Sequence, residues 1–497
     1  MANVPEIKKL AMIGCGSMGG GMALLFAEHG ITVLLNDPGE ATVDSLLKTA
    51  EKDGIRNKLE KHLDYEDLCK NLDSPKVFVF SLPHGTVGDS VVEGLHPYLE
   101  KGDLIIDASN ENWRNTQRRQ GKLVTQGVHY VGMGVSGGYQ AARRGPSMCP
   151  GGEDRALDMV LPLLQKVAAR DARGNPCVGR CGMGGSGHYV KMIHNGIEHG
   201  MMSAQAEAWQ IMNLGLGMTY DEIGDVFAKW NTDGELRGTF LIDIGAQINK
   251  QRDDKGKHVL SVVEDKVVQD IDGTEGTGVW SSEEAIRLHV PAPTLSDAHY
   301  VRVASAFRKD RKKIKATFGG HFPLEKWTGS EEEKPAFLED LRKAVYTAFL
   351  AAFVQGINVI DLADQENKWS INFCEVIQIW RNGCIIKADY IADLLEEIFK
   401  NPKDTDRDLL HNEGIAKELS ANFAALKRVV AMGVQTNAII PSLSASLEYL
   451  KYSVNTILPT QFYEAQLDFF GKHMFDLKSE PAGEPETGHH HYEWKPA

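Results

Sequence analysis

The sequence predicts an α/β domain with a doubly wound, mostly parallel sheet, followed by a large all-α domain and a C-terminal tail. Three observations carry this prediction: a glycine-rich turn between two short apolar strands near the N-terminus, alternating strand-like and helix-like segments up to about residue 180, and long helical patterns beyond it. Strands that alternate with helices are typical of a parallel sheet covered on both faces. We place the three parts at residues 1–185, 186–455 and 456–497.

The first βαβ unit carries a dinucleotide-binding fingerprint. Two short apolar strands, residues 8–13 and 31–35, flank a helix that ends near His29, and Asp37 follows the second strand. Glycines at the start of such a helix allow a tight turn and let a pyrophosphate approach the helix N-terminus. We therefore expect a Rossmann fold. The residues of this unit expected to hold the dinucleotide are Gly14, Gly16, Ser17, Met18, Gly19 and Asp37.

The remaining elements follow the same division. Strand-like runs recur at residues 77–80, 104–107 and 129–131, with helical segments between them, which predicts a parallel sheet. Few strand-like runs occur after Gly187. Helices are predicted there at residues 186–213, 220–230, 335–362 and 385–400, with one more stretch ending at Phe470 before a polar tail.

Composition excludes several classes of partner. The 497 residues are 42% hydrophobic and 25% charged, as in an ordinary soluble globular protein. A net charge of −14 argues against nucleic acid or an anionic membrane as the main partner. No apolar run approaches the roughly 18 residues of a membrane span, and the N-terminus lacks the apolar core of a signal peptide. We therefore expect a cytoplasmic protein.

The metal-binding residue types give no metal site. Seven cysteines are scattered along the chain, as expected of reduced thiols. Cys177 and Cys181 form the one close pair, but their spacing does not fit the usual zinc patterns and no second ligand pair follows. His489, His490 and His491 lie in a tail rich in Gly, Pro and Glu, where solvated side chains are expected instead of a metal site.

The segment 186–199 is the strongest candidate for chemistry. As a helix it places Lys191, His194, Asn195 and Glu198 on one face, at i, i+3, i+4 and i+7. An amine and a carboxylate on one face can take a proton and return one. A solvated polar face is the alternative interpretation. The apolar flanks argue against it, and so does Gly196, because a glycine inside a helix suggests close packing or close ligand approach.

The order of the motifs resembles the 6-phosphogluconate dehydrogenase family over nearly the whole chain. The matching segments are the glycine-rich turn at 14–19, Asp107-Ala-Ser-Asn110, Val135-Ser-Gly-Gly138, Gly145-Pro-Ser147, Pro150-Gly-Gly152, the helix segment 187–198, Asp225-Val-Phe-Ala-Lys-Trp-Asn231, Gly276-Thr-Gly278 and Phe470-Gly-Lys-His473. The resemblance implies a nicotinamide-dependent enzyme that oxidises a sugar acid and decarboxylates it. It also implies a homodimer in which the tail of one subunit inserts into its partner.

The resemblance assigns roles to individual residues. Lys191 would be the general base at the C3 hydroxyl and would later donate a proton during decarboxylation. Glu198 would protonate the enediol carbon, and His194 and Asn195 would orient substrate and cofactor. The carboxylate end of the substrate would be held by Asn110, Ser136, Gly137 and Gly138, and Asn110 would also contact the dinucleotide.

Two groups of positions depart from the family pattern. Where the family has Asn-Arg-Thr after the second strand, this chain has Asp37-Pro38-Gly39, and a carboxylate accepts from a ribose hydroxyl but repels a 2′-phosphate. The sequence therefore predicts NAD, with NADP less favoured. At the phosphate end of the substrate the family tyrosine, lysine and tail arginine are replaced by His199, Glu275 and Leu467, whereas Thr277, Arg302 and His473 remain.

These departures lead us to expect a decarboxylating dehydrogenase of a sugar acid that lacks the terminal phosphate. The first alternative is an ordinary 6-phosphogluconate dehydrogenase, in which other groups replace the lost anchor. The second is an inactive NAD-binding regulatory homologue, against which the four polar residues of the helix 186–199 argue. A plain β-hydroxyacid dehydrogenase shares the first domain and the lysine but lacks the long helical domain and the tail.

Overall fold

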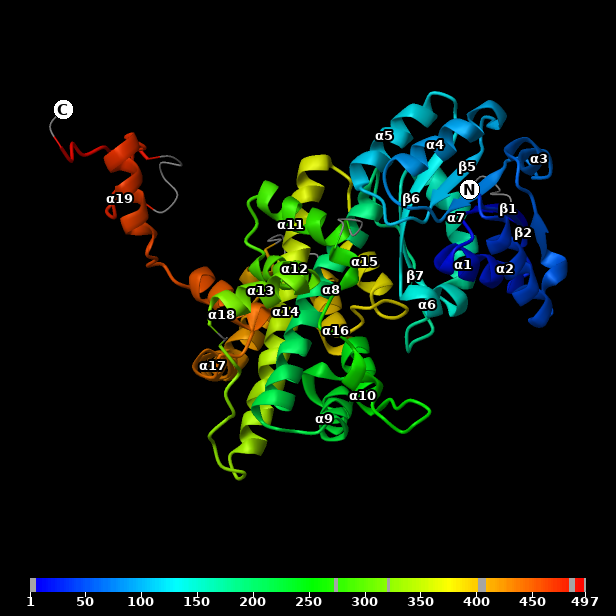
Figure 1. Ribbon diagram of the computed structural model, residues 1–497. Coiled ribbons are helices and arrows are strands. Elements are labelled where there is room, and N and C mark those ends of the chain that lie inside the picture. The colour runs from blue at the N-terminus through cyan, green and yellow to red at the C-terminus, as the bar shows by residue number, and fades with distance from the viewer. Residues whose placement is uncertain (1–5, 272–275, 320–321, 401–407, 482–487, 496–497) are drawn as a thin grey trace. The chain divides into compact units, whose positions relative to one another are not determined.

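The computed structural model describes residues 6–271, 276–319, 322–400, 408–481 and 488–495. The chain divides into two compact units, Met1–Leu447 and Glu448–Ala497, and each is described by itself. Figure 1 shows its helices and strands, coloured from blue at the N-terminus to red at the C-terminus.

The first domain is built on a seven-stranded sheet with the order β3-β2-β1-β4-β5-β6-β7. Its strands are β1 Lys9–Ile13, β2 Thr32–Asn36, β3 Leu59–Lys61, β4 Val77–Phe80, β5 Leu104–Asp107, β6 His129–Ser136 and β7 Ser147–Gly151. All neighbouring strands pair in parallel except β6 and β7, which form an antiparallel pair. The predicted parallel sheet is confirmed. The short strands β3 and β7 were not predicted, because three residues and a run containing Pro150 give little strand signal.

Helices cover both faces of this sheet. They are α1 Ser17–Glu28, α2 Glu40–Lys52, α3 Tyr65–Lys70, α4 Thr86–Leu95, α5 Trp113–Val124, α6 Gly138–Arg144 and α7 Asp154–Val167. Successive residues of β1 point to opposite faces of the sheet and so belong to two separate cores. Leu10 and Met12 pack with α1, α2 and α7, whereas Ala11 and Ile13 lie in the core that includes residues of α4 and α5. Burial on both faces explains why the central strands are apolar throughout.

The second domain is helical, as predicted. Its α-helices are α8 Ser186–Gln210, α9 Tyr220–Thr232, α10 Phe240–Lys250, α11 Thr277–Arg287, α12 Pro293–Ala306, α13 Arg308–Thr317, α14 Lys334–Asn367, α15 Phe373–Ile379, α16 Asp389–Phe399, α17 Glu413–Gln435 and α18 Pro441–Val454. Short helical segments of this domain are η3 Ile211–Gly215, η4 Gly234–Leu236, η5 Val259–Val262, η6 Val268–Asp270 and η7 Leu409–His411, whereas η1 Arg56–Lys58 and η2 His96–Tyr98 belong to the first domain.

Helices α8 and α14 pack against each other through small residues and form the centre of this domain (Figure 1). A Cβ atom built on Gly356 of α14 would lie 2.5 Å from Ile197 Cγ1 of α8, and one built on Gly200 would lie 3.1 Å from Ala352 Cβ. α14 is long and apolar enough to pass a length and composition test for a membrane span, but 89% of its most apolar window is buried inside the protein. It has the burial of a core helix.

α8 also lies directly against the sheet, because two successive positions on the face of β6 that meets it, Gly132 and Gly134, are glycines. A Cβ atom built on Gly134 would lie 2.1 Å from Lys191 Cβ, and one built on Gly132 would lie 2.9 Å from His188 Nδ1. Gly187 completes the contact, since a Cβ atom there would lie 2.2 Å from Gly132 O and 2.3 Å from Cys149 O. Ser136 shares the face of Gly132 and Gly134, because side chains alternate along a strand.

The second unit contains α19, Thr460–Gly471, and a segment that folds back along it. The buried Asp468 carboxylate accepts hydrogen bonds from the Trp494 indole at 2.8 Å and from the Tyr492 and Met474 backbone N–H groups, and His491 Nδ1 lies 2.9 Å from it. The expectation that the histidines of the tail are simply solvated is therefore wrong for His490 and His491. His490 pairs with the backbone of Phe475 and lies 2.7 Å from Glu480 Oε1.

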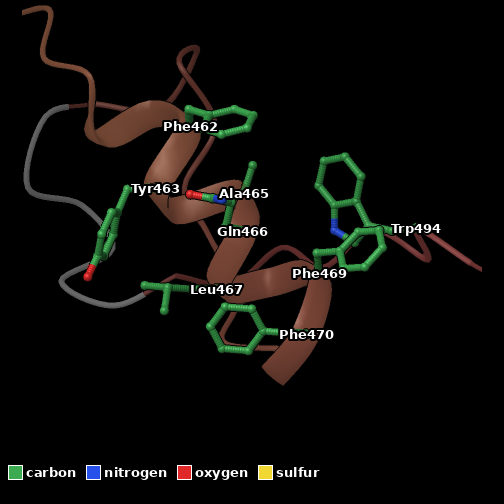
Figure 2. A pocket seen from close by; sticks show the side chains of 8 residues that line it. All are labelled: Phe462, Tyr463, Ala465, Gln466, Leu467, Phe469, Phe470 and Trp494. Carbon is green, nitrogen blue, oxygen red and sulfur yellow. The ribbon is translucent and has the colours of Figure 1, made fainter.

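α19 exposes several aromatic side chains. Figure 2 shows the side chains that line a pocket on it: Phe462, Tyr463, Ala465, Gln466, Leu467, Phe469, Phe470 and Trp494. Phe462 and Phe470 are each 71% exposed. Exposed aromatic residues concentrated on one short helix are typical of a surface that another protein segment covers.

The glycine contacts between α8 and β6 give a test of the fold. Gly187→Ala is expected to lower stability by about 2 kcal/mol or more, because the added methyl group meets backbone atoms that cannot move independently. Gly121→Ala in α5 is the matched control: no atom lies within 4 Å of its Cβ position, so alanine should stabilise that helix slightly. Thermal unfolding of both variants measures the difference. An equal or higher midpoint for Gly187→Ala than for Gly121→Ala would contradict the close contact.

Candidate functional site

The carboxyl ends of β1, β4 and β5 meet at one edge of the sheet, and the glycine-rich turn lies there. Gly14 has φ +92°, and a Cβ atom on it would lie 2.2 Å from Ser81 O, whereas nothing lies within 4 Å of a Cβ atom on Gly16. α1, which begins with Ser17 and Met18, has no side-chain cap and no acidic residue in its first turn. These features fit a dinucleotide pyrophosphate, which needs open space and unpaired N–H groups at a helix N-terminus.

Asp37 is held beside this turn by two backbone hydrogen bonds. The Cys15 N–H donates to Oδ2 at 2.7 Å, and the Gly39 N–H donates to Oδ1 at 2.8 Å. The carboxylate therefore has a fixed position at the end of β2, where a Rossmann fold receives the adenosine ribose. Asn110 lies exposed in the loop after β5, at the same edge of the sheet.

The polar face of α8 meets Ser136 at the end of β6. Lys191 Nζ donates to Ser136 Oγ at 3.1 Å, and His194 Nε2 lies 3.1 Å from the same oxygen. Lys191 Nζ also lies 3.3 Å from His194 Nδ1. Lys191 is 5% exposed and His194 is fully buried. Burial lowers the pKa of His194 well below its usual value, and the nearby Lys191 charge lowers it further, so this imidazole is neutral.

The polar contacts continue along α8. Asn195 Oδ1 lies 3.0 Å from His194 Nδ1, and Asn195 Nδ2 donates to Thr277 Oγ1 of α11 at 2.9 Å. Glu198 Oε2 lies 3.8 Å from His194 Nδ1, and the Glu198 side chain is 21% exposed. Gly196 has a packing role, since a Cβ atom there would lie 2.8 Å from Ser281 Oγ. The structure thus brings together six of the residues named from the sequence: Ser136, Lys191, His194, Asn195, Glu198 and Thr277.

The two glycines after Ser136 shape the turn into α6. Gly137 has φ +102°, and its Cβ position lies 2.4 Å from Gly383 O, so a side chain is excluded. Gly138 has φ +69° and open space at its Cβ position. Both conformations favour glycine.

One turn beyond Asn195 lies a cluster of two histidines, an arginine and an aspartate. A guanidinium N–H of Arg302 in α12 donates to His199 Nε2, and Arg302 Nε donates to Asp270 Oδ2 of η6 at 3.0 Å. The His199 ring stacks on His299 with centroids 6.0 Å apart. Burial lowers the pKa of His199 well below its usual value, and the Arg302 charge lowers it further.

Three residues named from the sequence are not placed in this site. Glu275 lies outside the residues that the structure describes. Leu467 and His473 belong to the second unit. Among the described residues no group of three or more His, Cys, Asp or Glu side chains is arranged to hold a metal ion.

Sequence reasoning missed several neighbours of the site. Asp270, which pairs with Arg302, and His299, which stacks on His199, lie in segments with no distinctive pattern. A contact between His84 in the loop after β4 and Trp280 of α11, with ring centroids 5.1 Å apart, was also missed. The glycines of β6 did leave a signal: glycines at two successive positions of one strand face, 132 and 134, indicate close approach of another backbone.

Comparisons with known proteins agree with this architecture. Residues 9–183 match the family profile described as the NAD binding domain of 6-phosphogluconate dehydrogenase, and residues 187–494 match the one described as its C-terminal domain. A decarboxylating 6-phosphogluconate dehydrogenase of Emericella nidulans is 43% identical over 97% of this chain and 100% of its own length.

Two further proteins extend the comparison. A Bacillus subtilis protein named as NADP(+)-dependent decarboxylating 6-phosphogluconate dehydrogenase is 32% identical over 98% of this chain and 99% of its own. The Plasmodium falciparum 6-phosphogluconate dehydrogenase, whose structures include complexes with NADP+ and with 6-phosphogluconate, superimposes with a TM-score of 0.87 at 30% identity. That superposition covers 98% of this chain and 100% of the other.

Proposed function

The chain belongs to the 6-phosphogluconate dehydrogenase family of decarboxylating oxidoreductases, and we propose that it converts 6-phosphogluconate to a ketopentose phosphate and carbon dioxide. The observation that carries this proposal is the cluster on α8, in which Lys191, His194 and Asn195 lie within hydrogen-bond distance of one another or of Ser136 and Thr277. Full-length relatives that carry the 6-phosphogluconate dehydrogenase name support the phosphorylated substrate over the non-phosphorylated acid that the sequence departures favour.

In the proposed mechanism, Lys191 acts in its neutral amine form and accepts the proton of the C3 hydroxyl. A bound nicotinamide dinucleotide would supply the hydride acceptor at the edge of the sheet. The product is a β-keto acid, in which Lys191, now protonated, donates to the C3 carbonyl oxygen while the C1–C2 bond breaks and carbon dioxide leaves. Glu198 then protonates C2 of the enediol, and loss of the hydroxyl proton gives the ketose. His194, Ser136 and Asn195 hold the reacting hydroxyl and the carboxylate in place.

A non-phosphorylated sugar acid is the second candidate substrate. It is favoured by the ion pair between Arg302 and Asp270, because an arginine already paired with a carboxylate attracts a phosphate less strongly. The inactive regulatory homologue remains the alternative of another class.

For the cofactor we propose NAD. The fixed Asp37 carboxylate supports this, since it suits a free ribose hydroxyl and opposes a 2′-phosphate. The name of one relative favours NADP instead, because the Bacillus subtilis protein is named as NADP(+)-dependent. A direct kinetic comparison decides between them.

We also propose a cytoplasmic homodimer in which the tail of one subunit contacts its partner. The exposed aromatic side chains of α19 support this, because a helix that exposes several aromatic rings is stabilised when a second surface covers them (Figure 2).

An assay of the purified protein tests the reaction. With 6-phosphogluconate and either dinucleotide, reduction of the nicotinamide and release of carbon dioxide should occur in equal amounts. Gluconate and other sugar acids belong in the same panel. Reduction without carbon dioxide would refute decarboxylation, and faster turnover of a non-phosphorylated acid would favour the second candidate. No turnover of any acid would support the inactive homologue.

The proton-transfer roles predict strong effects on turnover. Lys191→Ala and Glu198→Ala should each lower kcat by about 100-fold or more, the usual scale for general acid–base groups. Dinucleotide binding, followed by fluorescence titration, should change little. Lys70→Ala, at an exposed surface pair with Glu66, is the control and should retain wild-type kcat. Near-normal kcat for Lys191→Ala would show that the base is misassigned.

The cofactor proposal predicts at least about a tenfold higher kcat/KM with NAD than with NADP, a difference of roughly 1.4 kcal/mol. Asp37→Ala combined with Pro38→Arg should narrow or reverse this ratio. Asp44→Ala, which removes an exposed carboxylate of α2, should leave it unchanged. A wild-type preference for NADP would reject the proposal.

The dimer proposal predicts that charge on α19 weakens association. Phe462→Asp with Phe470→Asp should lower the mass measured by sedimentation equilibrium toward that of the monomer, since two charges would have to be buried in the interface. Leu63→Asp, at a 47% exposed position in the first unit, is the control. An unchanged dimer in the α19 variant, or a monomeric wild type, would contradict tail exchange.

A further inference from the structure

The polar face of α8 extends beyond the residues that the proposed mechanism uses. Lys191 and His199 are eight positions apart, which corresponds to about 12 Å along a helix. A six-carbon acid whose C3 hydroxyl lies at Lys191 therefore extends its far end toward His199 and Arg302. The following inference rests on the proposed function and concerns that far end.

The hydrogen bond from Arg302 fixes the protonation state of His199. A guanidinium is always a donor, so His199 Nε2 must be the acceptor and carry no proton. The neutral ring then holds its proton on Nδ1. His199 is 4% exposed, and its Nδ1 has no hydrogen-bond partner among the described residues. A buried N–H without an acceptor is costly, which points to a ligand atom that completes it.

The Arg302 charge beside His199 is offset by the Asp270 carboxylate. Arg302 and His299 face His199 from α12, Gly278 lies against it from α11, and Lys191 is a further cation on its own helix. Asp270 does not contact His199 itself but pairs with Arg302, and the Asp270 side chain is 3% exposed. Arg302 therefore has its Nε engaged by a carboxylate and one terminal nitrogen engaged by an imidazole. This arrangement suits a neutral hydroxyl as it stands and lacks the net positive charge that a phosphate dianion requires.

We propose that His199 is a specificity-determining residue that binds the phosphate end of the substrate only with uptake of one proton from solvent. The proton adds to Nε2, and the Arg302 hydrogen bond to that nitrogen is lost. The released guanidinium N–H and the imidazolium then both donate to phosphate oxygens. A sugar acid that ends in a hydroxyl binds without this proton.

The first test is calorimetric titration of the full-length protein with 6-phosphogluconate at pH 7.5, in two buffers of different ionisation enthalpy. The difference in observed heat should correspond to about one proton taken up for each ligand bound. Gluconate should take up none. Binding of 6-phosphogluconate without proton uptake would overturn the inference, and so would a failure to bind it at any pH from 6.5 to 8.5.

The second test is the pH dependence of affinity. Between pH 6.5 and 8.5, where a phosphate monoester is a dianion, Kd for 6-phosphogluconate should rise by up to about tenfold per pH unit, and Kd for gluconate by much less. His199→Tyr should abolish both the proton uptake and the slope, because its hydroxyl donates without titrating in this range. His258→Tyr, at a surface histidine paired with Asp221, should keep both.

A further variant tests the inference independently of the histidine variants, in case these do not fold. Asp270→Asn frees the charge of Arg302 and should raise the affinity for 6-phosphogluconate at pH 8.5, with little effect on gluconate. Loss of affinity for both acids would assign Asp270 a purely structural role and contradict the charge argument. Normal turnover of 6-phosphogluconate without proton uptake rejects this inference alone, whereas absence of turnover rejects the proposed function.

Discussion

The contact between α8 and the two glycines on the facing side of β6 is the constraint on which the site depends. Gly132 and Gly134 allow the helix backbone to lie against the strand, and Gly187 allows the same from the helix side. Larger residues at these positions would move Lys191 away from Ser136. Because Ser136 continues the face of the two glycines, the same packing that joins the two domains also places the hydroxyl beside the amine.

Burial at this junction gives the polar groups their chemical character. In a site that excludes water, hydrogen bonds and charges act more strongly than at the surface, but unpaired polar groups also cost more. His194 is neutral and contacts the Ser136 hydroxyl, the Lys191 amine and the Asn195 amide. Such a network holds each group in one orientation before substrate arrives, which lowers the reorganisation needed during proton transfer.

Much of the architecture could be predicted from the sequence. The βαβ unit at residues 8–37 and the one-face spacing of Lys191, Asn195 and Glu198 are local patterns, and local patterns are visible in a single chain. The pairing of Asp270 with Arg302 was not visible, because the two residues meet only after a turn and a helix fold over α8. The folded-back tail was missed for the same reason, since it depends on contacts between distant segments.

Asp37 has a consequence for how nucleotide preference changes during evolution. Its carboxylate holds both the glycine-rich turn, through Cys15, and the start of the following loop, through Gly39. A mutation that replaces this side chain with an apolar one therefore removes the charge and also two hydrogen bonds that fix the backbone beside the cofactor site. An asparagine could retain one of these hydrogen bonds without the charge, through its single amide oxygen, whereas an alanine would lose both. Lineages that exchange one nucleotide for the other would then be expected to pass through the amide.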